Sequence, residues 1–362
     1  MDGEIRMKIL LTGTEGYVGT MMAPTLMQRG HKVTGVDTGF YRSGWLYHGV
    51  SGAPEWLNRD IREITDEELR GFDAVVHLAE LSNDPLGQLN PTVTFEINHQ
   101  GSVALARKCK AAGVPRFVYA SSCSVYGVGE GDEIKTEESP VRPQTAYAEC
   151  KAMVERDVSA LADDNFSPTF LRNATAFGPS PRMRFDIVLN NLSGLAWTTR
   201  EIKLTSDGTP WRPLVHVLDM AEAVACTLEA PRQSVHDRIF NVGDSDGNYR
   251  VREIAEIVAE TFPGCALTIG NSDGDNRSYR VSFEKIREHL PTFRCRYDAR
   301  AGAEQLRAVF ERIGMTAELF QSPPYTRLKM LKHLIETEQL DTDLFWRDRT
   351  NTRNKQEGQA QP

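Results

Sequence analysis

A glycine-rich loop between a strand and a helix constrains the fold of this chain more than any other feature. An apolar run, Lys8–Thr12, is followed by Gly13, Gly16 and Gly19, and then by a helical stretch and a second apolar run that ends at Asp37. Glycines in such a loop let main-chain amides approach a pyrophosphate, which then lies at the positively polarised start of the helix. The order of strand, loop, helix, strand and acid therefore predicts a dinucleotide site, although two residues rather than one separate the first two glycines.

Asp37 bears on which dinucleotide is bound. A carboxylate at the end of this second strand accepts hydrogen bonds from the adenosine ribose hydroxyls and repels the extra phosphate of NADP. Arg42 follows a few residues later and could offset that repulsion. We expect NAD rather than NADP.

A tyrosine and a lysine four residues apart suggest proton chemistry. Tyr147 and Lys151 share one face of a helix at this spacing, so the ammonium lies near the phenol and favours its ionised form. A free tyrosine ionises near pH ~10 and needs such help to act as a base at neutral pH. Ser122, upstream in the chain, could hold a substrate oxygen. The pair alone is common on surface helices, and it gains meaning from the dinucleotide motif.

Strand-like and helical patterns alternate through the first half of the chain. Apolar runs at 74–78, 116–120 and 168–172 are separated by helical stretches. This alternation predicts an α/β fold, a Rossmann-type doubly wound parallel sheet with helices on both faces.

The pattern changes after this region, which suggests a second domain. We expect an NAD-binding domain over 7–180, with a strand at Arg238–Val242, in the segment 212–245, that returns to its sheet. The mixed pieces over 181–345 predict a smaller, discontinuous C-terminal substrate-binding domain. The polar residues 347–362 predict a disordered tail.

Composition excludes several classes of protein. A net charge of −8 and a pI near 5.6 argue against a nucleic-acid-binding surface. The six cysteines form no C-x-x-C pair, so neither a metal site nor a disulfide framework is predicted. No apolar run reaches the ~18 residues of a membrane span. We expect a cytoplasmic protein whose anionic substrate is captured by locally placed arginines.

Taken together and in order, these motifs resemble those of the NAD-dependent nucleotide-sugar epimerase/dehydratase family of extended short-chain dehydrogenases/reductases. The resemblance runs from Lys8 to about Tyr279 and includes Asp60-Ile61, His77-Leu78-Ala79, Asn98 and the stretch 120–127 around Ser122. It implies a catalytic set of Ser122, Tyr147 and Lys151. The cofactor-binding residues that it implies are Gly13, Gly16, Tyr17, Val18, Gly19, Asp37, Asp60, Ile61, Leu78, Ala79, Asn98 and Lys151.

The resemblance also implies contacts to a nucleoside-diphosphate sugar. Asn191 and Leu192 lie in a stretch that resembles the family's diphosphate contact, and Arg212 lies in one that carries a diphosphate-binding arginine. A guanidinium suits this role because it matches phosphate oxygens bidentately. Arg277 offers a second cation, while Ser124 and Thr175 complete the predicted substrate set.

Two departures from the family pattern bear on the reaction. Dehydratases carry an Asp-Glu pair after the catalytic serine or threonine, whereas this chain has Cys123 and Ser124, so a 4,6-dehydratase is disfavoured. Thr175 replaces an asparagine that many members use. Glu80 and Asp84 follow the nicotinamide-side strand and could either face the substrate or belong to a plain loop.

Three functions stay open. A 4-epimerase would oxidise C4 transiently with Tyr147 as base and return the hydride to the other face. A 4-ketoreductase or 4-dehydrogenase would run half of that cycle with NAD(P) and exchange its cofactor. A non-catalytic NAD-binding regulator would need a broken catalytic set, and this set is intact. By the resemblance we also expect a homodimer formed by the helices after Asn98 and around Tyr147. Val103, Leu105, Met153 and Val154 could make this contact or equally face the protein's own core.

Two G-x-S-x-G segments resemble a hydrolase nucleophile elbow. Ser245 and Ser272 occupy their centres, but both loops are rich in acids and glycine, which is typical of solvated turns. The histidines show no metal-binding spacing, and His216 is expected to be a core or near-core residue.

Overall fold

The computed structural model describes residues 6–50, 52–82, 90–129, 133–272 and 278–347, so the predicted tail lies almost entirely outside them. The first half of the chain and one returning strand form a seven-stranded sheet in which every neighbouring pair is parallel. Across the sheet the strands are β11 (Arg238–Val242), β7 (Ser167–Asn173), β5 (Arg116–Ser122), β4 (Ala74–His77), β1 (Lys8–Thr12), β2 (Lys32–Asp37) and β3 (Glu55–Asn58).

The strand order reverses at β1, as the doubly wound prediction requires. The chain proceeds from β1 to β2 and β3 on one side and then returns to β4 on the other side. Ligands of such sheets bind at the carboxyl ends of the strands beside this switch point. The predicted returning strand is confirmed, because Arg238 pairs with Thr169 at the far edge of the sheet.

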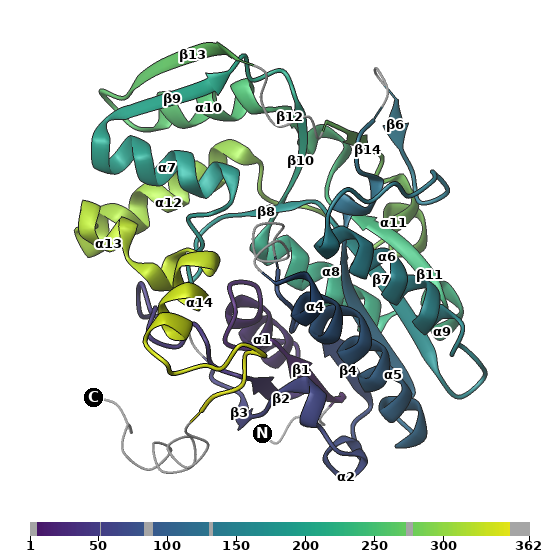
Figure 1. Cartoon of the computed structure of the whole chain (residues 1–362). Coiled ribbons are helices and arrows are strands. Elements are labelled where there is room, and N and C mark those ends of the chain that lie inside the picture. Colours follow the sequence, from purple (N-terminus) through teal and green to yellow (C-terminus); the bar gives the residue numbers. More distant parts are fainter. Residues whose placement is uncertain (1–5, 51, 83–89, 130–132, 273–277, 348–362) are drawn as a thin grey trace.

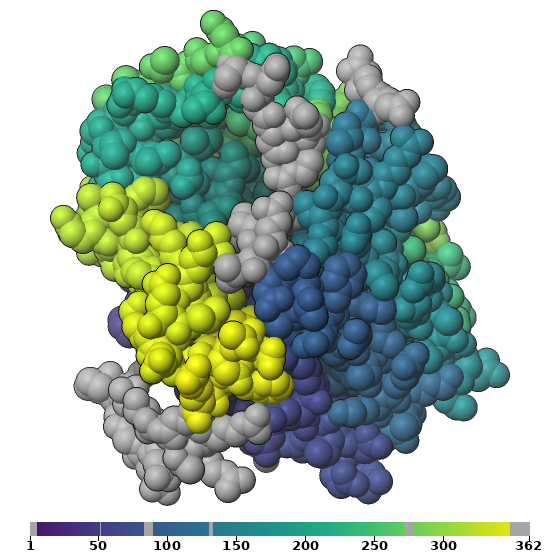
Figure 2. All heavy atoms as spheres, viewed as in Figure 1, coloured from purple at the N-terminus to yellow at the C-terminus, as the bar shows by residue number. Residues whose placement is uncertain are grey.

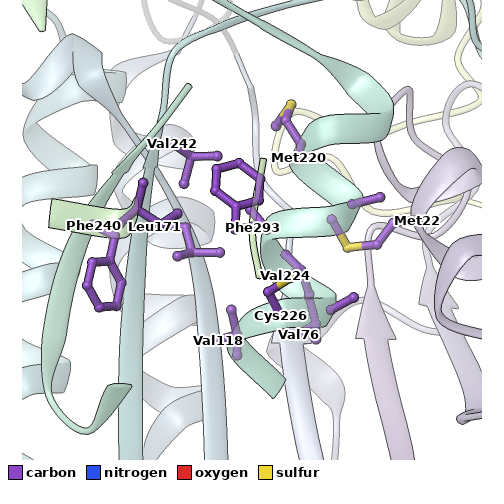
Figure 3. Close-up of a cluster of buried hydrophobic side chains, with 14 of the residues drawn as sticks. Met22, Val76, Val118, Leu171, Met220, Val224, Cys226, Phe240, Val242 and Phe293 are labelled. Carbon is purple, nitrogen blue, oxygen red and sulfur yellow. The ribbon is translucent and has the colours of Figure 1, made fainter. Parts of the chain in front are cut away.

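Each face of the sheet carries its own buried core. Helices α1 (Gly19–Gln28) and α8 (Val217–Glu229) cover one face, and α5 (Ser102–Ala111) and α6 (Ala146–Ser159) cover the other. Successive strand residues point to opposite faces, so Val76 joins the first cluster and Val75 the second. Figure 3 shows the first cluster, in which strand residues such as Val118 and Leu171 face Val224 of α8.

The second half forms a smaller unit around a third cluster. Its core lies among α7 (Val188–Thr199), α10 (Val251–Thr261) and α12 (Ala299–Ile313), together in Figure 1 with the parallel pair β9 (Glu201–Ser206) and β13 (Ala266–Ser272). A three-stranded sheet, β12–β10–β8, adjoins this unit. Its strands are β8 (Thr175–Phe177), β10 (Trp211–His216) and β12 (Asn248–Arg250).

The end of the described chain returns to the first half. Helix α14 (Arg327–Glu336) contributes Leu331 and Leu334 to the same cluster as Leu10 and Val36 of the large sheet. In Figure 2 the yellow C-terminal segment accordingly borders the dark blue and purple first part of the chain. The boundary at residue 180 stays a prediction.

Short elements complete the fold. They are α2 (Asp66–Leu69), α4 (Pro91–Thr94), α9 (Arg232–Val235), α11 (Glu284–His289), α13 (Ala317–Gln321), the π-helical turn Phe95–Gly101, and the parallel pair β6 (Ile134–Lys135) with β14 (Arg280–Val281). The 3₁₀ turns are Ile61–Glu63, Cys123–Tyr126, Ser245–Gly247 and Pro323–Tyr325. Within the described residues, no helix has the length and apolar character needed to cross a membrane.

Candidate active site

A cavity of about 700 Å³ lies at the carboxyl ends of the strands and brings most of the predicted residues together. Its predicted lining residues are Gly13, Gly16, Tyr17, Val18, Gly19, Asp37, Asp60, Ile61, Leu78, Ala79, Ser122, Ser124, Tyr147, Lys151, Thr175, Asn191 and Arg212. Asn98 and Leu192 are not among the residues that line it. Arg277 lies outside the described residues.

The glycine loop is packed too tightly for side chains at two positions. Gly13 has φ +76°, and a Cβ there would lie 2.9 Å from the Ala79 nitrogen. A Cβ on Gly19 would lie 2.1 Å from the Gly13 oxygen. The loop therefore keeps main-chain groups at the cavity surface where α1 begins, which is the arrangement that binds a pyrophosphate.

Asp37 ends β2 with its carboxylate held by the main chain. Its oxygens accept hydrogen bonds from the amides of Glu15, at 2.9 Å, and Gly39, at 2.8 Å. Burial raises the pKa of Asp37, although the Gly39 amide opposes that shift. The Arg42 guanidinium stacks on the Trp56 ring at 3.8 Å.

Tyr17 joins the glycine loop to the second unit. Its hydroxyl donates to the Gly178 carbonyl at 2.7 Å and accepts from the Asn190 amide at 3.2 Å. Burial raises its pKa strongly, so the phenol stays neutral. Through these bonds Tyr17 positions the loop between the two parts of the molecule.

Tyr147 and Lys151 lie on successive turns of α6, as the spacing predicted. The helix begins beside the cavity because the Thr145 hydroxyl caps it, accepting from the Ala148 amide at 3.2 Å. The Lys151 ammonium lies 5.5 Å from the centre of the Tyr147 ring. Ser122, at the end of β5, faces the same cavity.

A buried carboxylate holds Lys151 from behind. Glu80 Oε2 lies 2.7 Å from Lys151 Nζ, and Tyr119 donates its hydroxyl proton to Glu80 Oε1 at 2.6 Å. Lys151 also donates to the Ala120 carbonyl. The ammonium has three protons and the bond to Ala120 uses one of them, so Lys151 keeps donor capacity for the cavity.

Glu80 and Lys151 form a buried salt bridge, with side chains 1% and 5% exposed. Burial lowers the pKa of Lys151, but the charges of Glu80 and Tyr147 outweigh this and raise it. Burial raises the pKa of Glu80, and Lys151 pulls it back. Glu80 is therefore more than a plain loop residue: it lines the cavity and its carboxylate is paired with Lys151. Asp84 lies outside the described residues.

The residues after Ser122 differ sharply from an acid–base pair. The Cys123 thiol is fully buried and donates to the Arg172 carbonyl at 3.1 Å, and burial raises the thiol pKa strongly. The Ser124 amide donates to the Ser122 hydroxyl at 3.2 Å. The Ser124 hydroxyl itself is buried and has no hydrogen-bond partner in the described part of the chain, so it is available to a ligand.

The predicted substrate residues come from separate elements. Thr175 begins β8 and Arg212 lies on β10 next to Trp211, whose carbonyl it contacts at 2.8 Å. The Asn191 amide donates to the Phe185 carbonyl at 2.8 Å. Leu192 belongs to the third apolar cluster.

Asn98 does not line the cavity but supports a main-chain segment next to it. Its amide oxygen accepts from the Leu81 amide at 2.8 Å, and its nitrogen donates to the Leu81 carbonyl at 3.0 Å. Asn98 thereby fixes the main chain just after Leu78 and Ala79.

The cavity is also lined by residues that the sequence predictions did not include, among them Tyr41, Arg184, Asp186 and Arg327. Arg184 bonds Asp186 at 2.9 Å and the Ser82 hydroxyl at 3.2 Å. The dense charges of Arg-Met-Arg-Phe-Asp at 182–186 were a signal that could have suggested a site. No motif or residue pattern around position 327 in the sequence suggested that Arg327 belongs to the site.

The hydrolase and metal alternatives find no support in this geometry. Ser245 is bonded to Glu284 at 3.0 Å, and the second elbow lies partly outside the described residues. His216 is buried and contacts the Gln305 side chain at 2.9 Å, as expected of a core residue. No cluster of three or more potential metal ligands occurs within the described ranges.

Comparison with known proteins identifies the family. A family model described as "NAD dependent epimerase/dehydratase family" matches residues 9–243, more than half of the chain. The chain belongs to this family.

Its curated relatives include nucleotide-sugar epimerases. The UDP-glucose 4-epimerase of Corynebacterium glutamicum is 30% identical over 302 residues, covering 78% of this chain and 90% of that protein. The UDP-glucose 4-epimerase of Streptococcus mutans is 28% identical over 314 residues, with coverages of 78% and 91%.

Solved structures share the fold across different reactions. The UDP-glucose 4-epimerase of Thermus thermophilus, in complex with NAD, has a TM-score of 0.69 and 25% identity, covering 83% of this chain and 99% of that one. The dTDP-glucose 4,6-dehydratase from Streptomyces venezuelae has a TM-score of 0.74 and 24% identity, covering 86% and 100%. The fold is therefore common to epimerases and dehydratases.

The residues of this family member fit NAD. The main-chain groups around Gly13 and Gly19 leave no room for a Cβ at either position, and this loop leads directly into the start of α1. When bound there, NAD supplies hydride chemistry in an enzyme of this family. Lys151 keeps donor capacity for a ribose hydroxyl beside Tyr147.

Proposed function

We propose that this enzyme is an NAD-dependent nucleotide-sugar 4-epimerase. The main support is that Ser122, Tyr147 and Lys151 all line the dinucleotide cavity. The residues after Ser122 do not form a competent acid–base pair. A buried thiol at Cys123 cannot serve as the acid that dehydration requires. The curated relatives at 28–30% identity are UDP-glucose 4-epimerases, which favours the same reaction.

The proposed chemistry assigns a proton to Tyr147 and a binding role to Ser122. The Tyr147 phenolate would take the proton of the sugar O4, and NAD held at the glycine loop would supply the hydride acceptor that lets C4 become a ketone. Ser122 donates a hydrogen bond to the resulting carbonyl oxygen. After the sugar turns, Tyr147 would return the proton to O4 as C4 is reduced on its other face.

The substrate class follows from the charge of the site. The chain is acidic, so a diphosphate with about two negative charges needs a local cation, and Arg212 lines the cavity. Charge-assisted hydrogen bonds contribute roughly 1.5–3 kcal/mol each. Arg212→Ala should therefore raise the KM for the nucleotide sugar about ten- to a hundredfold with NAD occupancy unchanged. Equal turnover of the free monosaccharide would contradict this assignment.

The decisive experiment is a screen for C4 inversion. The full-length protein is purified without added cofactor, and any bound nucleotide is released by denaturation and identified. Fresh enzyme is then incubated in D₂O with UDP- and GDP-linked hexoses, and products are followed by NMR. Epimerisation predicts inversion at C4 without deuterium in the sugar and without net NADH.

Other results would identify other reactions. Stoichiometric NADH or NADPH turnover would favour the 4-ketoreductase or 4-dehydrogenase, and deuterium at C5 with loss of water would favour a dehydratase. Tyr147→Phe tests the proposed base. Its activity should fall about 10²–10⁴-fold, while its affinity for NAD should stay within a few-fold of that of the unmodified enzyme. More than about a tenth of the activity remaining would contradict Tyr147 as base.

We also propose a homodimer, as family resemblance suggests. Val103, Leu105 and Val154 are buried in the chain's own core, so they are not free for a partner; Met153 is only partly buried. Other exposed residues of α5 and α6 would then form the contact. A concentration-independent monomer mass in solution scattering would refute the dimer.

A further inference from the structure

Arg327 is a buried cation in the wall of the cavity, and it comes from the far end of the chain. It begins α14, beyond the residues 9–243 that the family model matches. Its side chain lines the same cavity as the glycine loop and is only 3% exposed. A guanidinium at this depth needs strong partners to offset the loss of water.

The partners of Arg327 in the protein are weak ones. Within the described residues its hydrogen bonds go only to main-chain carbonyls, those of Pro324 at 3.3 Å and Arg182 at 3.4 Å. The guanidinium also lies over the Tyr41 ring, 4.0 Å from its centre. Burial lowers the pKa of Arg327 to about 10, which still leaves it charged at neutral pH. A negatively charged ligand in the cavity would therefore gain from this cation.

The neighbours of Arg327 locate it along the cavity. Its guanidinium donates to the Arg182 carbonyl at 3.4 Å, and the Arg182 guanidinium is paired at 2.5 Å with Glu15 of the glycine loop. Arg327 therefore lies close to the loop that is expected to hold the middle of the dinucleotide. In a dinucleotide, the group between the adenosine ribose and the nicotinamide half is the pyrophosphate.

The charge balance points the same way. Arg184 is matched by Asp186 at 2.9 Å, so this pair adds little net charge to the wall. The start of α1 contributes only about half a positive charge, against about two negative charges on a pyrophosphate. Arg327 adds a full positive charge to this wall, and within the described residues the carboxylates of Asp186 and Asp37 act on it without a direct ion pair.

We propose that Arg327 binds the pyrophosphate of NAD and that the C-terminal segment 327–346 thereby forms part of the dinucleotide site. The segment is fastened at the adenosine end of the site. The Trp346 indole donates to the Thr38 carbonyl at 2.7 Å, directly after Asp37. Arg62, which is paired with Asp60 at 2.7 Å, lies over the Phe345 ring at 3.8 Å.

The test measures ligand binding to the cofactor-stripped, full-length chain. Arg327→Leu removes the charge, and Arg327→Lys keeps it without the planar fork. Lys329→Leu is the matched control, because Lys329 lies on the same helix but is exposed. Affinities for NAD, ADP-ribose and adenosine are measured by calorimetry, with adenosine measured in competition, and thermal melting monitors folding.

Loss of one charge-assisted contact predicts that Arg327→Leu weakens NAD and ADP-ribose about ten- to a hundredfold. Adenosine, which carries no phosphate, should change less than about twofold, Arg327→Lys should be intermediate, and Lys329→Leu should match the unmodified protein. An equal loss for adenosine and NAD would assign Arg327 a structural role and overturn the proposal. Unchanged NAD affinity, or a loss confined to sugar-substrate KM, would also overturn it.

This inference rests on the family's use of NAD and not on the proposed C4 epimerisation. Binding is measured without any sugar, so the two proposals fail separately. An enzyme that proves to be a dehydrogenase would still show the Arg327 effect on ADP-ribose. A confirmed epimerase whose Arg327→Leu variant binds NAD normally would refute the inference alone.

Discussion

Removing Glu80 should cost far more stability than removing a surface carboxylate. Glu80→Ala leaves the Lys151 ammonium, 5% exposed, without its partner at 2.7 Å. Breaking one side of a buried ion pair typically costs about 3–5 kcal/mol, because an uncompensated charge stays buried. Glu55 offers a matched control: it pairs with Lys32 at 3.5 Å with side chains 70% and 47% exposed, so Glu55→Ala should cost less than ~1 kcal/mol.

A double-mutant cycle separates the ion pair from other effects of each substitution. In the Glu80→Ala background, Lys151→Met should cost much less than in the unmodified chain, since the orphaned charge is removed with it. We expect a coupling energy of about 2 kcal/mol or more for this pair and less than about 0.5 kcal/mol for Lys32 with Glu55.

The assay is urea denaturation of the cofactor-stripped chain, followed by fluorescence at fixed pH and salt. All variants are compared without NAD, since any ligand of the folded state would add its own stabilisation. If Glu80→Ala and Glu55→Ala prove equally mild, or if the Glu80–Lys151 cycle is additive, the pair does not carry the buried charge inferred from the structure.

Three other perturbations test separate features of the site. Asp37→Ser should weaken NAD and relax exclusion of NADP, as measured by binding of both; equal NADP binding by the unmodified chain would contradict the role of Asp37. Gly19→Ala should impair NAD binding much more than Gly16→Ala in the same titration, because the added Cβ would lie 2.1 Å rather than 3.1 Å from the Gly13 oxygen. Burial lowers the pKa of His77 to about 3, so unfolding takes up a proton below pH ~6.5 and folding stability falls with pH from there towards pH 3. His77→Gln should therefore reduce the slope of unfolding free energy against pH by about 1.4 kcal/mol per pH unit between pH 6 and 4, and an unchanged slope would refute it.

Local sequence was sufficient to predict much of the fold and many residues that line the candidate site. The glycine loop, the strand ending at Asp37 and the Tyr147–Lys151 spacing each depend on contacts between residues close in sequence. Strand alternation likewise predicted the parallel sheet, including the return of Arg238–Val242, which β11 confirms. The physical reason is that turn geometry and the two- and 3.6-residue periods are set by the chain's immediate neighbours.

Only the tertiary structure decided which side chains meet across the fold. Glu80 follows a predicted strand, yet its partnership with Lys151 depends on how α6 packs on the sheet. Leu192 and Asn191 are neighbours in sequence, but only Asn191 lines the cavity. Arg327 reaches the dinucleotide site because α14 buries its apolar face in the second cluster, against residues of the large sheet that are far from it in sequence. These tertiary contacts form because packing buries apolar surface. How that surface is buried depends on the whole packed chain rather than on any local sequence pattern.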